Sequence, residues 1–302
     1  KATGNSVLSS RMIEALALSG QFDEAQEALE NHSSTNTAYA EAMLQALINR
    51  VKSEQLLALG DIVGGTAALQ LYRNALRVAI GIDSRNTMPY IRLCKSLLNE
   101  YRLTQNKVLL EEALRIADEA TSTGEQTEQF VIVRADVLHA DGQFNRAIDR
   151  LMRYLADHPD ASIVRQHLIE AYLDSDNIDR ALTTAKDGVK ADPTSADWYR
   201  RLGNLHIRAN DDVGEGVKAF LEAIQKEPTV SLLLRIDEVT RTDQELPNQE
   251  LLVMARGPLS KLHPIAGAIE AKALMNLGRK RDGLLAMERS WNLFQQAAAN
   301  GW

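Results

Sequence analysis

The sequence predicts an all-α protein, a solenoid of about eight antiparallel helix pairs. Alanine and leucine are abundant while aromatic residues make up only 5% of the chain, which favours packed helices over sheets. Amphipathic segments also follow one another in pairs joined by short polar turns. Finally, Pro159, Pro193 and Pro228 close similar segments at separations of 34 and 35 residues, and 34 residues is a period typical of helix–turn–helix repeats.

The N-terminal part carries weaker copies of this pattern. A helix pair is expected over residues 12–30, with Ala25 after its turn. A long helix is expected over about 37–59, followed by a second helix that carries Ala68, Tyr72 and Ala75. Residues 89–120 fit another pair with a lengthened turn.

The central repeats are the clearest, and they cover residues 128–159, 162–193 and 196–228. In each of them a small residue follows the turn (Ala147, Ala181 or Gly216), which suits a close approach of two helices. The closing prolines lack an N–H group and disfavour helix in the preceding residue, so they separate consecutive repeats.

The pattern weakens after Pro228. Residues 231–262 are expected to form a degenerate helix pair, and residues 264–298 a recognisable C-terminal pair. Because a repeat of this kind buries its apolar face only by stacking on its neighbours, we expect residues 1–302 to form one continuous solenoid domain.

The central segments resemble the tetratricopeptide repeat family, whose pattern is an aromatic residue, Leu-Gly, Tyr, Ala, an aromatic residue, Ala and Pro. Residues 196–228 carry this pattern as Tyr199, Leu202, Gly203, His206, Gly216, Phe220, Ala223 and Pro228. The resemblance implies a right-handed superhelix. It also places His206 where the family has tyrosine, so we expect a hydrogen-bonded residue at the edge of the core.

Composition excludes several classes of function. The net charge of −7 argues against a nucleic-acid partner bound through its phosphate backbone, although it leaves a local basic patch open. No apolar run approaches the length needed for direct membrane insertion. A single cysteine, Cys94, excludes an internal disulfide framework, and we expect it to be a buried structural thiol. The chain begins at Lys1 without Met or a visible signal peptide, so we interpret it as an excised piece of a longer protein. We expect it to be soluble, and its compartment, cytoplasm or periplasm, stays open.

No motif predicts catalysis or a cofactor. Gly60, Gly64 and Gly65 lack the Lys-Ser/Thr ending and the preceding strand of a phosphate-binding loop, so we expect an inter-helical turn there. Nucleophile elbows and zinc-binding signatures do not occur. We therefore expect no catalytic residues, no cofactor and no enzymatic activity.

Two carboxylates and two histidines suggest an alternative, a divalent metal site. Asp136 and His139 lie three residues apart, as do His167 and Glu170, and one repeat separates Asp136 from Glu170. The two carboxylates should stack on adjacent first helices, roughly 8–10 Å apart. A polar wall explains these residues without a metal, and we predict no metal site.

The family resemblance implies that the first helix of each repeat lines a concave surface that receives a peptide or a partner helix. Its inner-face spacing selects a partner-binding groove that is acidic at its centre and of mixed charge toward its C-terminal side: Gln129, Ile132, Asp136, His139, Gln166, Glu170, Leu173, Asp197, Arg200, Asn204, Ile207 and Arg208. Arg200 with Asn204 resembles the first part of the family's two-carboxylate clamp, which is incomplete because the next first helix offers no equivalent asparagine.

The leading hypothesis is a non-enzymatic protein–protein interaction scaffold that binds a peptide or helix of an unidentified partner. One alternative is an adaptor segment of a larger cell-envelope, secretion or polysaccharide-export assembly, and another is an enzyme whose catalytic domain lies outside these residues. Trp291 and Phe294 on the C-terminal helix either cap the solenoid or mediate self-association.

Overall fold

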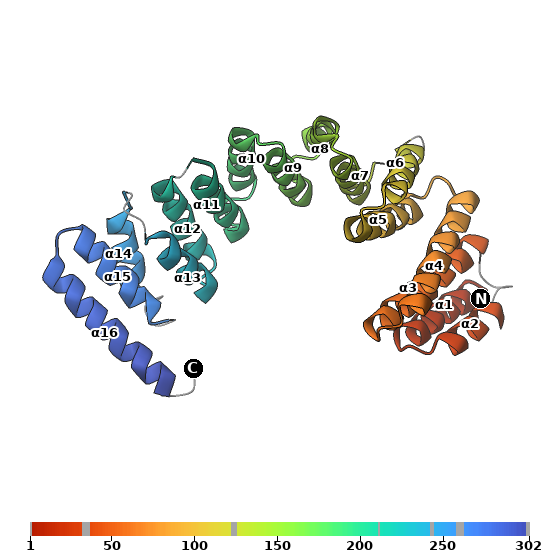
Figure 1. Cartoon of the computed structure of the whole chain (residues 1–302), viewed down its shortest axis with the longest axis horizontal. Coiled ribbons are helices and arrows are strands. Elements are labelled where there is room, and N and C mark those ends of the chain that lie inside the picture. The colour runs from red at the N-terminus through yellow and green to blue at the C-terminus, as the bar shows by residue number, and fades with distance from the viewer. Residues whose placement is uncertain are drawn as a thin grey trace. The chain divides into compact units, whose positions relative to one another are not determined.

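The computed structural model describes residues 2–31, 37–121, 126–210, 212–241, 245–257 and 263–299, and within them it contains sixteen helices and no strand (Figure 1). The predicted all-α fold of repeated helix pairs is confirmed. The chain divides into two compact units, Lys1–Tyr154 and Leu155–Trp302. The prediction of one continuous superhelix concerns how these units are joined, and it stays a prediction.

Unit 1 contains the first seven helices and most of the eighth. Its helices are α1 (Ala2–Leu18), α2 (Phe22–Asn31), α3 (Ala38–Ala58), α4 (Ile62–Ile82), α5 (Thr87–Thr104), α6 (Lys107–Thr121), α7 (Glu128–Ala140) and α8 (Phe144–Asp157).

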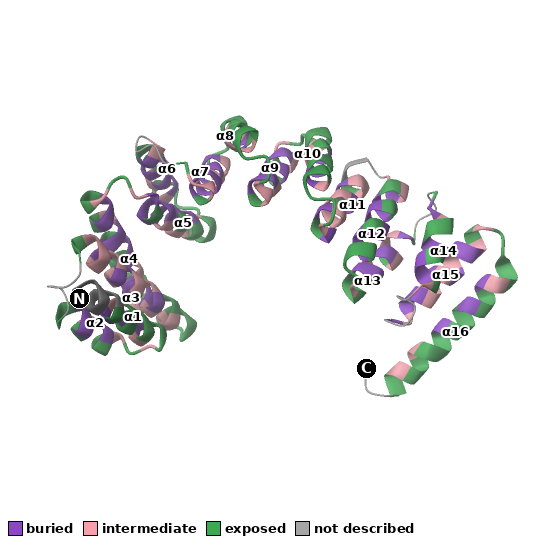
Figure 2. Cartoon of the chain, turned by 180° about the vertical axis from the view of Figure 1, so that it is seen from behind, coloured by how far each residue is buried: buried purple, intermediate pink, exposed green. Residues whose placement is uncertain are grey.

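Unit 2 begins within the last turn of α8 and contains the other eight helices. These are α9 (Ser162–Asp174), α10 (Ile178–Ala191), α11 (Ala196–Asn210), α12 (Val213–Lys226), α13 (Val230–Val239), α14 (Asn248–Arg256), α15 (Ile265–Asn276) and α16 (Lys280–Ala299). Buried residues lie on the sides that the helices turn toward one another, and exposed residues lie on the outer sides (Figure 2).

The turn between α3 and α4 shows how the pairs are closed. Gly60 adopts a left-handed conformation with φ of 84°, which glycine reaches without steric cost. Asp61 then caps α4, because its side chain accepts a hydrogen bond of 2.9 Å from the Gly64 N–H. Gly60 therefore lies in the predicted inter-helical turn, whereas Gly64 and Gly65 belong to the first turn of α4, so the prediction is wrong for these two glycines.

The prediction of a lengthened turn between α5 and α6 is wrong. Only Gln105 and Asn106 separate the two helices, and the additional residues extend α5 to Thr104. Tyr101 packs partly buried against the core of unit 1 and so keeps the extra turn of helix attached to it. Gln105 then ends the helix in a left-handed conformation, with φ of 56°.

An arginine lies within the core of unit 1. Arg73 on α4 is only 1% exposed, and its guanidinium forms an ion pair of 2.6 Å with Glu100 on α5. It also donates hydrogen bonds of 2.9 Å to the hydroxyl and to the carbonyl of Ser96. A buried charge is tolerated only when it is paired and hydrogen-bonded, so these contacts fix α4 against α5.

Two glycines bring α11 and α12 together in unit 2. A Cβ atom at Gly203 would lie 2.6 Å from the Phe220 ring, and one at Gly216 would lie 2.6 Å from the Ile207 side chain. The backbones of the two helices therefore cross where neither residue carries a side chain. Phe220 fills the adjoining core with Val217 and Ile224.

We predict that Gly203→Ala destabilises unit 2 by about 1–3 kcal/mol, because the new methyl group overpacks the helix crossing. Gly81→Ala is the matched control, since its Cβ would meet nothing within 4 Å. It should leave stability unchanged or raise it by up to about 1 kcal/mol, through the better helix propensity of alanine. Urea unfolding of both variants measures the difference, and equal effects would contradict the close crossing.

We predict that Cys94 does not react with thiol reagents while the protein is folded. Its thiol is buried, as expected from the sequence, and burial raises its pKa to about 12. The reactive thiolate is therefore scarce at pH values near 8. Labelling at that pH should follow the rate of unfolding, and rapid labelling of the native protein would contradict this placement.

Candidate functional site

The predicted groove residues of unit 2 lie on two first helices, α9 and α11, and the next first helix is α13. Two polar contacts join these helices: Arg201 lies 3.6 Å from the Glu170 carboxylate, and Arg235 donates a hydrogen bond of 3.4 Å to the Asn204 side-chain oxygen. We call this surface the first-helix face; it comprises Gln166, Glu170, Leu173, Asp197, Arg200, Arg201, Asn204, Ile207, Arg208 and Arg235.

Most of the predicted residues on this face are accessible. Glu170, Asp197, Asn204 and Arg208 are exposed, and Gln166, Leu173 and Arg200 are half-buried. Ile207 is half-buried against the core of unit 2. The face can therefore present both charges and some apolar surface.

Of Arg200 and Asn204, the two residues of the incomplete clamp, Asn204 contacts an arginine of the following first helix, α13. Arg200 forms an ion pair with Asp197 on its own helix, and Asn204 accepts its hydrogen bond from Arg235 on α13. Arg235 also pairs with Glu238 at 2.8 Å. Arg235 was not among the predicted groove residues, although it lies about one repeat after Arg201, and this spacing could have identified it.

The remaining predicted groove residues lie on α7 in unit 1. Gln129 is exposed, Asp136 and His139 are half-buried, and Ile132 is only 9% exposed, so it contributes mainly to packing. The His139 ring packs edge-on against Phe144, with 4.9 Å between ring centroids.

Asp136 and Glu170 belong to different units, so their stacking and a groove continuous through both units stay predictions. Within the described ranges no three or more His, Cys, Asp or Glu residues are grouped so that they could hold a metal ion.

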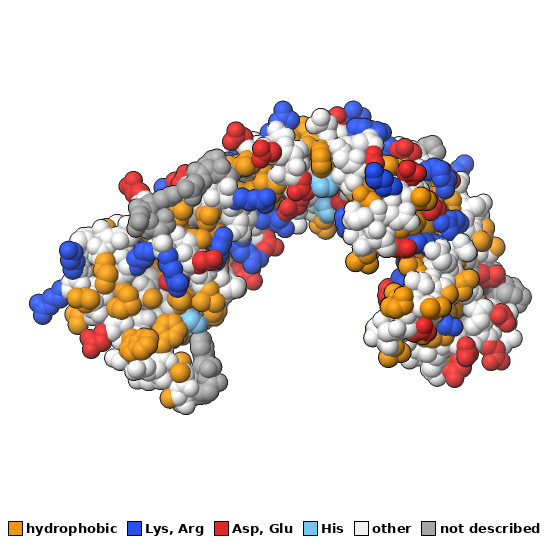
Figure 3. Space-filling view, viewed as in Figure 1, with side chains coloured by type: hydrophobic (Ala, Val, Ile, Leu, Met, Phe, Trp, Pro, Cys, Tyr) orange, Lys and Arg blue, Asp and Glu red, His pale blue; other side chains and the backbone are white. Residues whose placement is uncertain are grey.

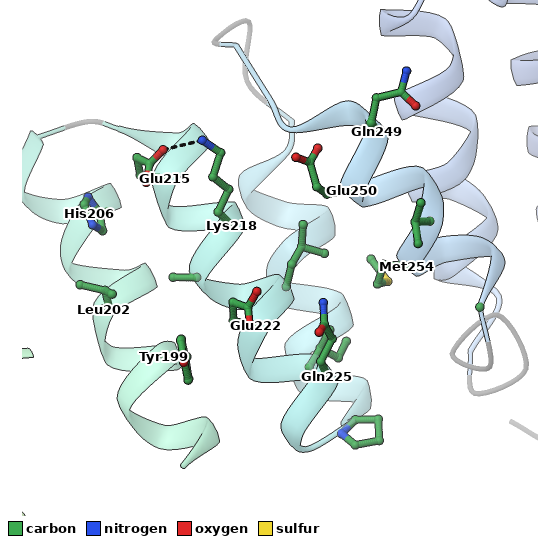
Figure 4. A pocket seen from close by; sticks show the side chains of 16 residues that line it. Tyr199, Leu202, His206, Glu215, Lys218, Glu222, Gln225, Gln249, Glu250 and Met254 are labelled. Carbon is green, nitrogen blue, oxygen red and sulfur yellow. Dashed lines mark hydrogen bonds and ion pairs between the residues drawn. The ribbon is translucent and has the colours of Figure 1, made fainter. Parts of the chain in front are cut away.

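A pocket of about 1100 Å³ opens between α11, α12 and α14 in unit 2. Figure 4 shows Tyr199, Leu202 and His206 on α11, Glu222 on α12 and Met254 on α14 among the side chains that line it. The sequence did not predict this pocket, because the repeat pattern after Pro228 is too weak to indicate where α14 packs.

The pocket combines an apolar wall with an acidic rim. Val253 is 74% exposed although it is apolar, and it lines the pocket beside Met254. Lys218 pairs with Glu215 at 2.6 Å, and this hydrogen bond raises the pKa of Lys218. Glu222 and Glu250 add two more carboxylates to the lining, so its carboxylates outnumber its lysine.

His206 is half-buried in the pocket wall, as the family pattern implied. Its Nδ1 atom is buried and has no hydrogen-bond partner within the described residues, which differs from the hydrogen-bonded residue expected. Burial lowers its pKa, and the charge of Lys186 lowers it further, whereas Asp212 and Glu215 act in the opposite direction.

The C-terminal helix α16 carries an apolar surface (Figure 3). Trp291 is 62% exposed, and with Met287 and Phe294 it lines a hollow of about 570 Å³ next to α15. Self-association through this surface stays a prediction. None of the described helices is both long enough and apolar enough to cross a lipid bilayer.

Comparison with protein families identifies tetratricopeptide repeats in part of the chain. Residues 138–212 match a tetratricopeptide repeat family model, so the resemblance is confirmed for this segment. A search of the curated proteins found no match.

Solved structures show weaker similarity. MamA from Desulfovibrio magneticus RS-1 is 17% identical, with 61% of this chain and 95% of that chain covered and a TM-score of 0.43. TTC0263, a tetratricopeptide repeat protein of Thermus thermophilus, is 20% identical, with coverages of 66% and 97% and a TM-score of 0.44. YrrB, described as having an unusual peptide-binding site, is 18% identical, with coverages of 64% and 92% and a TM-score of 0.41. At these identities and TM-scores the similarities carry no inference about function.

We predict that His206 makes unit 2 less stable in mild acid. The folded state disfavours the protonated form of this histidine, because burial lowers its pKa from the ordinary value of 6.5. Unfolding therefore takes up a proton below pH 6.5, so the stabilisation is complete above that value and is lost as the pH falls through the folded-state pKa.

Urea unfolding at about pH 7.5 and about pH 5.5, on either side of the ordinary histidine pKa, measures this loss. The loss should be smaller in His206→Gln than in the wild type or in His158→Gln, whose histidine is exposed in the same unit. Equal losses in all three proteins would contradict the assignment.

Proposed function

We propose that the chain is a non-enzymatic scaffold for protein–protein interaction, and that unit 2 binds a segment of its partner in the pocket between α11, α12 and α14. The tetratricopeptide repeats of residues 138–212 support the scaffold. The proposed binding site rests on the pocket itself, because binding sites on proteins are usually concave, mostly apolar surfaces with a few polar groups.

The lining of the pocket suggests the chemistry of the partner. Val253 and Met254 favour an apolar side chain of the partner at the centre. Glu222 and Glu250 favour basic residues beside it, because opposite charges across an interface speed association and disfavour acidic competitors. An amphipathic helix or extended segment with lysine or arginine next to its apolar residues meets both requirements.

The first-helix face is proposed as a second contact surface. Its ion pairs, Arg201 with Glu170 and Arg200 with Asp197, are all partly exposed. Exposed pairs of this kind contribute only about 0–1 kcal/mol each, so a partner can replace them at little cost. A segment with basic residues at one end and acidic residues at the other suits this mixed surface. A role as an adaptor in a larger envelope or secretion assembly remains an alternative that no described contact favours.

We predict that Val253→Asp abolishes capture of a specific partner, because a carboxylate would replace the exposed apolar contact of the pocket. The substitution is at a solvent-exposed side chain, so unit 2 should still fold. Affinity capture with the wild type and with Val253→Asp, quantified by mass spectrometry, measures the loss. Leu284→Asp on α16 is the matched control, since Leu284 is also exposed and lies outside the pocket.

A second variant separates the two surfaces. Glu170→Lys with Arg200→Glu reverses two charges of the first-helix face and leaves the net charge unchanged. Loss of the partner only in Val253→Asp assigns binding to the pocket, and loss only in the charge-reversed variant assigns it to the first-helix face. A partner retained by both variants would refute both surfaces.

A further inference from the structure

A small cavity between α7 and α8 in unit 1 is lined by four arginines. Its volume is about 170 Å³, and Leu138 and Asp149 complete its walls beside Arg134, Arg146, Arg150 and Arg153. Arg134 belongs to α7, and the other three belong to α8 at a spacing of four and three residues. Residues at this spacing share one face of a helix, so three guanidinium groups project from α8 toward the side where Arg134 lies.

Arg134 is held in place by α6. Its side chain is 11% exposed, and one of its terminal nitrogens lies 2.9 Å from the Asp118 carboxylate. The other terminal nitrogen donates a hydrogen bond to the Thr121 hydroxyl. Its Nε atom is buried without a hydrogen-bond partner in the described part of the chain, so one donor of this arginine is unsatisfied.

Arg150 shows the same incomplete pairing. Its Nη2 atom donates a hydrogen bond of 2.7 Å to the Gln126 side chain, while its buried Nε atom has no partner among the described residues. Burial lowers the pKa of Arg150, and the charges of Arg134 and Arg153 lower it further. Burial likewise lowers the pKa of Arg134, and Arg146 contributes to this shift. The protein therefore holds these cations together against their mutual repulsion, which an anion would relieve.

The charge balance around the cavity suggests which anion fits. Asp149 lines the cavity and Asp118 pairs with Arg134 from outside it, so these two carboxylates offset two of the four guanidinium charges and two positive charges are left in excess. A phosphoryl group carries on the order of two negative charges at pH 7 and three acceptor oxygens, whereas a carboxylate carries one charge. A nucleic-acid backbone would need a longer basic surface than this single cavity on a chain of net charge −7.

We propose that this cavity is a binding site for a single phosphoryl group, either free phosphate or the phosphate of a phosphorylated side chain. Arginine suits this ligand because its planar fork donates two parallel hydrogen bonds to an oxyanion. Arg134 and Arg150 form the fixed base of the site, and Arg146 and Arg153 close on the ligand. The site lies in unit 1, so it is independent of the pocket proposed in unit 2.

Isothermal titration of the full chain with inorganic phosphate, O-phosphoserine, serine and acetate at equal ionic strength tests the proposal. Phosphate and O-phosphoserine should bind with one site per chain, and serine and acetate should not. The double variant R146Q/R153Q should weaken phosphate binding by about tenfold or more, since each arginine contributes charge-assisted hydrogen bonds. Arg134 and Arg150 are left unchanged because their substitution would also disturb packing.

The control variant R85Q/R102Q removes two exposed arginines of the same unit, outside the cavity. It should bind phosphate as the wild type does. Tighter binding of O-phosphoserine than of phosphate would support a phosphorylated side chain as the ligand, and the reverse order would support free phosphate. Absence of phosphate binding, equal binding of acetate, or equal weakening in both double variants would overturn the site.

Discussion

The close approach of the two helices within each pair is the constraint on which the rest of the structure depends. Where α11 crosses α12, Gly203 and Gly216 leave no room for a side chain, and this allows Phe220 to fill the core beside the crossing. A single pair of closely packed helices cannot bury all of its apolar surface, so the next pair must pack against it. The surfaces that no neighbouring pair covers are available for binding partners.

This constraint explains why the fold could be predicted from the sequence more completely than the sites. Small residues after a turn and prolines at a fixed period mark helix pairs directly, so the repeats around Pro159, Pro193 and Pro228 were predicted with their boundaries nearly correct. The extra turn of α5 was missed because a lengthened turn was predicted there. Tyr101 instead continues the helix and packs against the core of unit 1. Local sequence patterns describe neighbours along the chain well.

The sites depend on neighbours in space. The pocket of unit 2 exists because α14 packs near α12 and α15, an arrangement that the degenerate segment after Pro228 does not encode in any periodic pattern. The arginine cavity is similar, since a turn of the chain separates Arg134 on α7 from the arginines of α8. Its polar partners Asp118 and Thr121 come from yet another helix. Charge patterns on single helices therefore could not predict either site.

The buried guanidinium of Arg73 limits how this repeat array can be rearranged. Solenoids change length when whole helix pairs are duplicated or lost, and this requires each pair to fit any neighbour. The pair formed by α3 and α4 does not have that freedom, because Arg73 needs Ser96 and Glu100 from the following pair. A different pair inserted after α4 would leave a cation enclosed without a counter-charge, at a cost of about 3–5 kcal/mol. A core contact therefore fixes the order of these two pairs, and we expect helices α3 to α6 to be duplicated or lost only together.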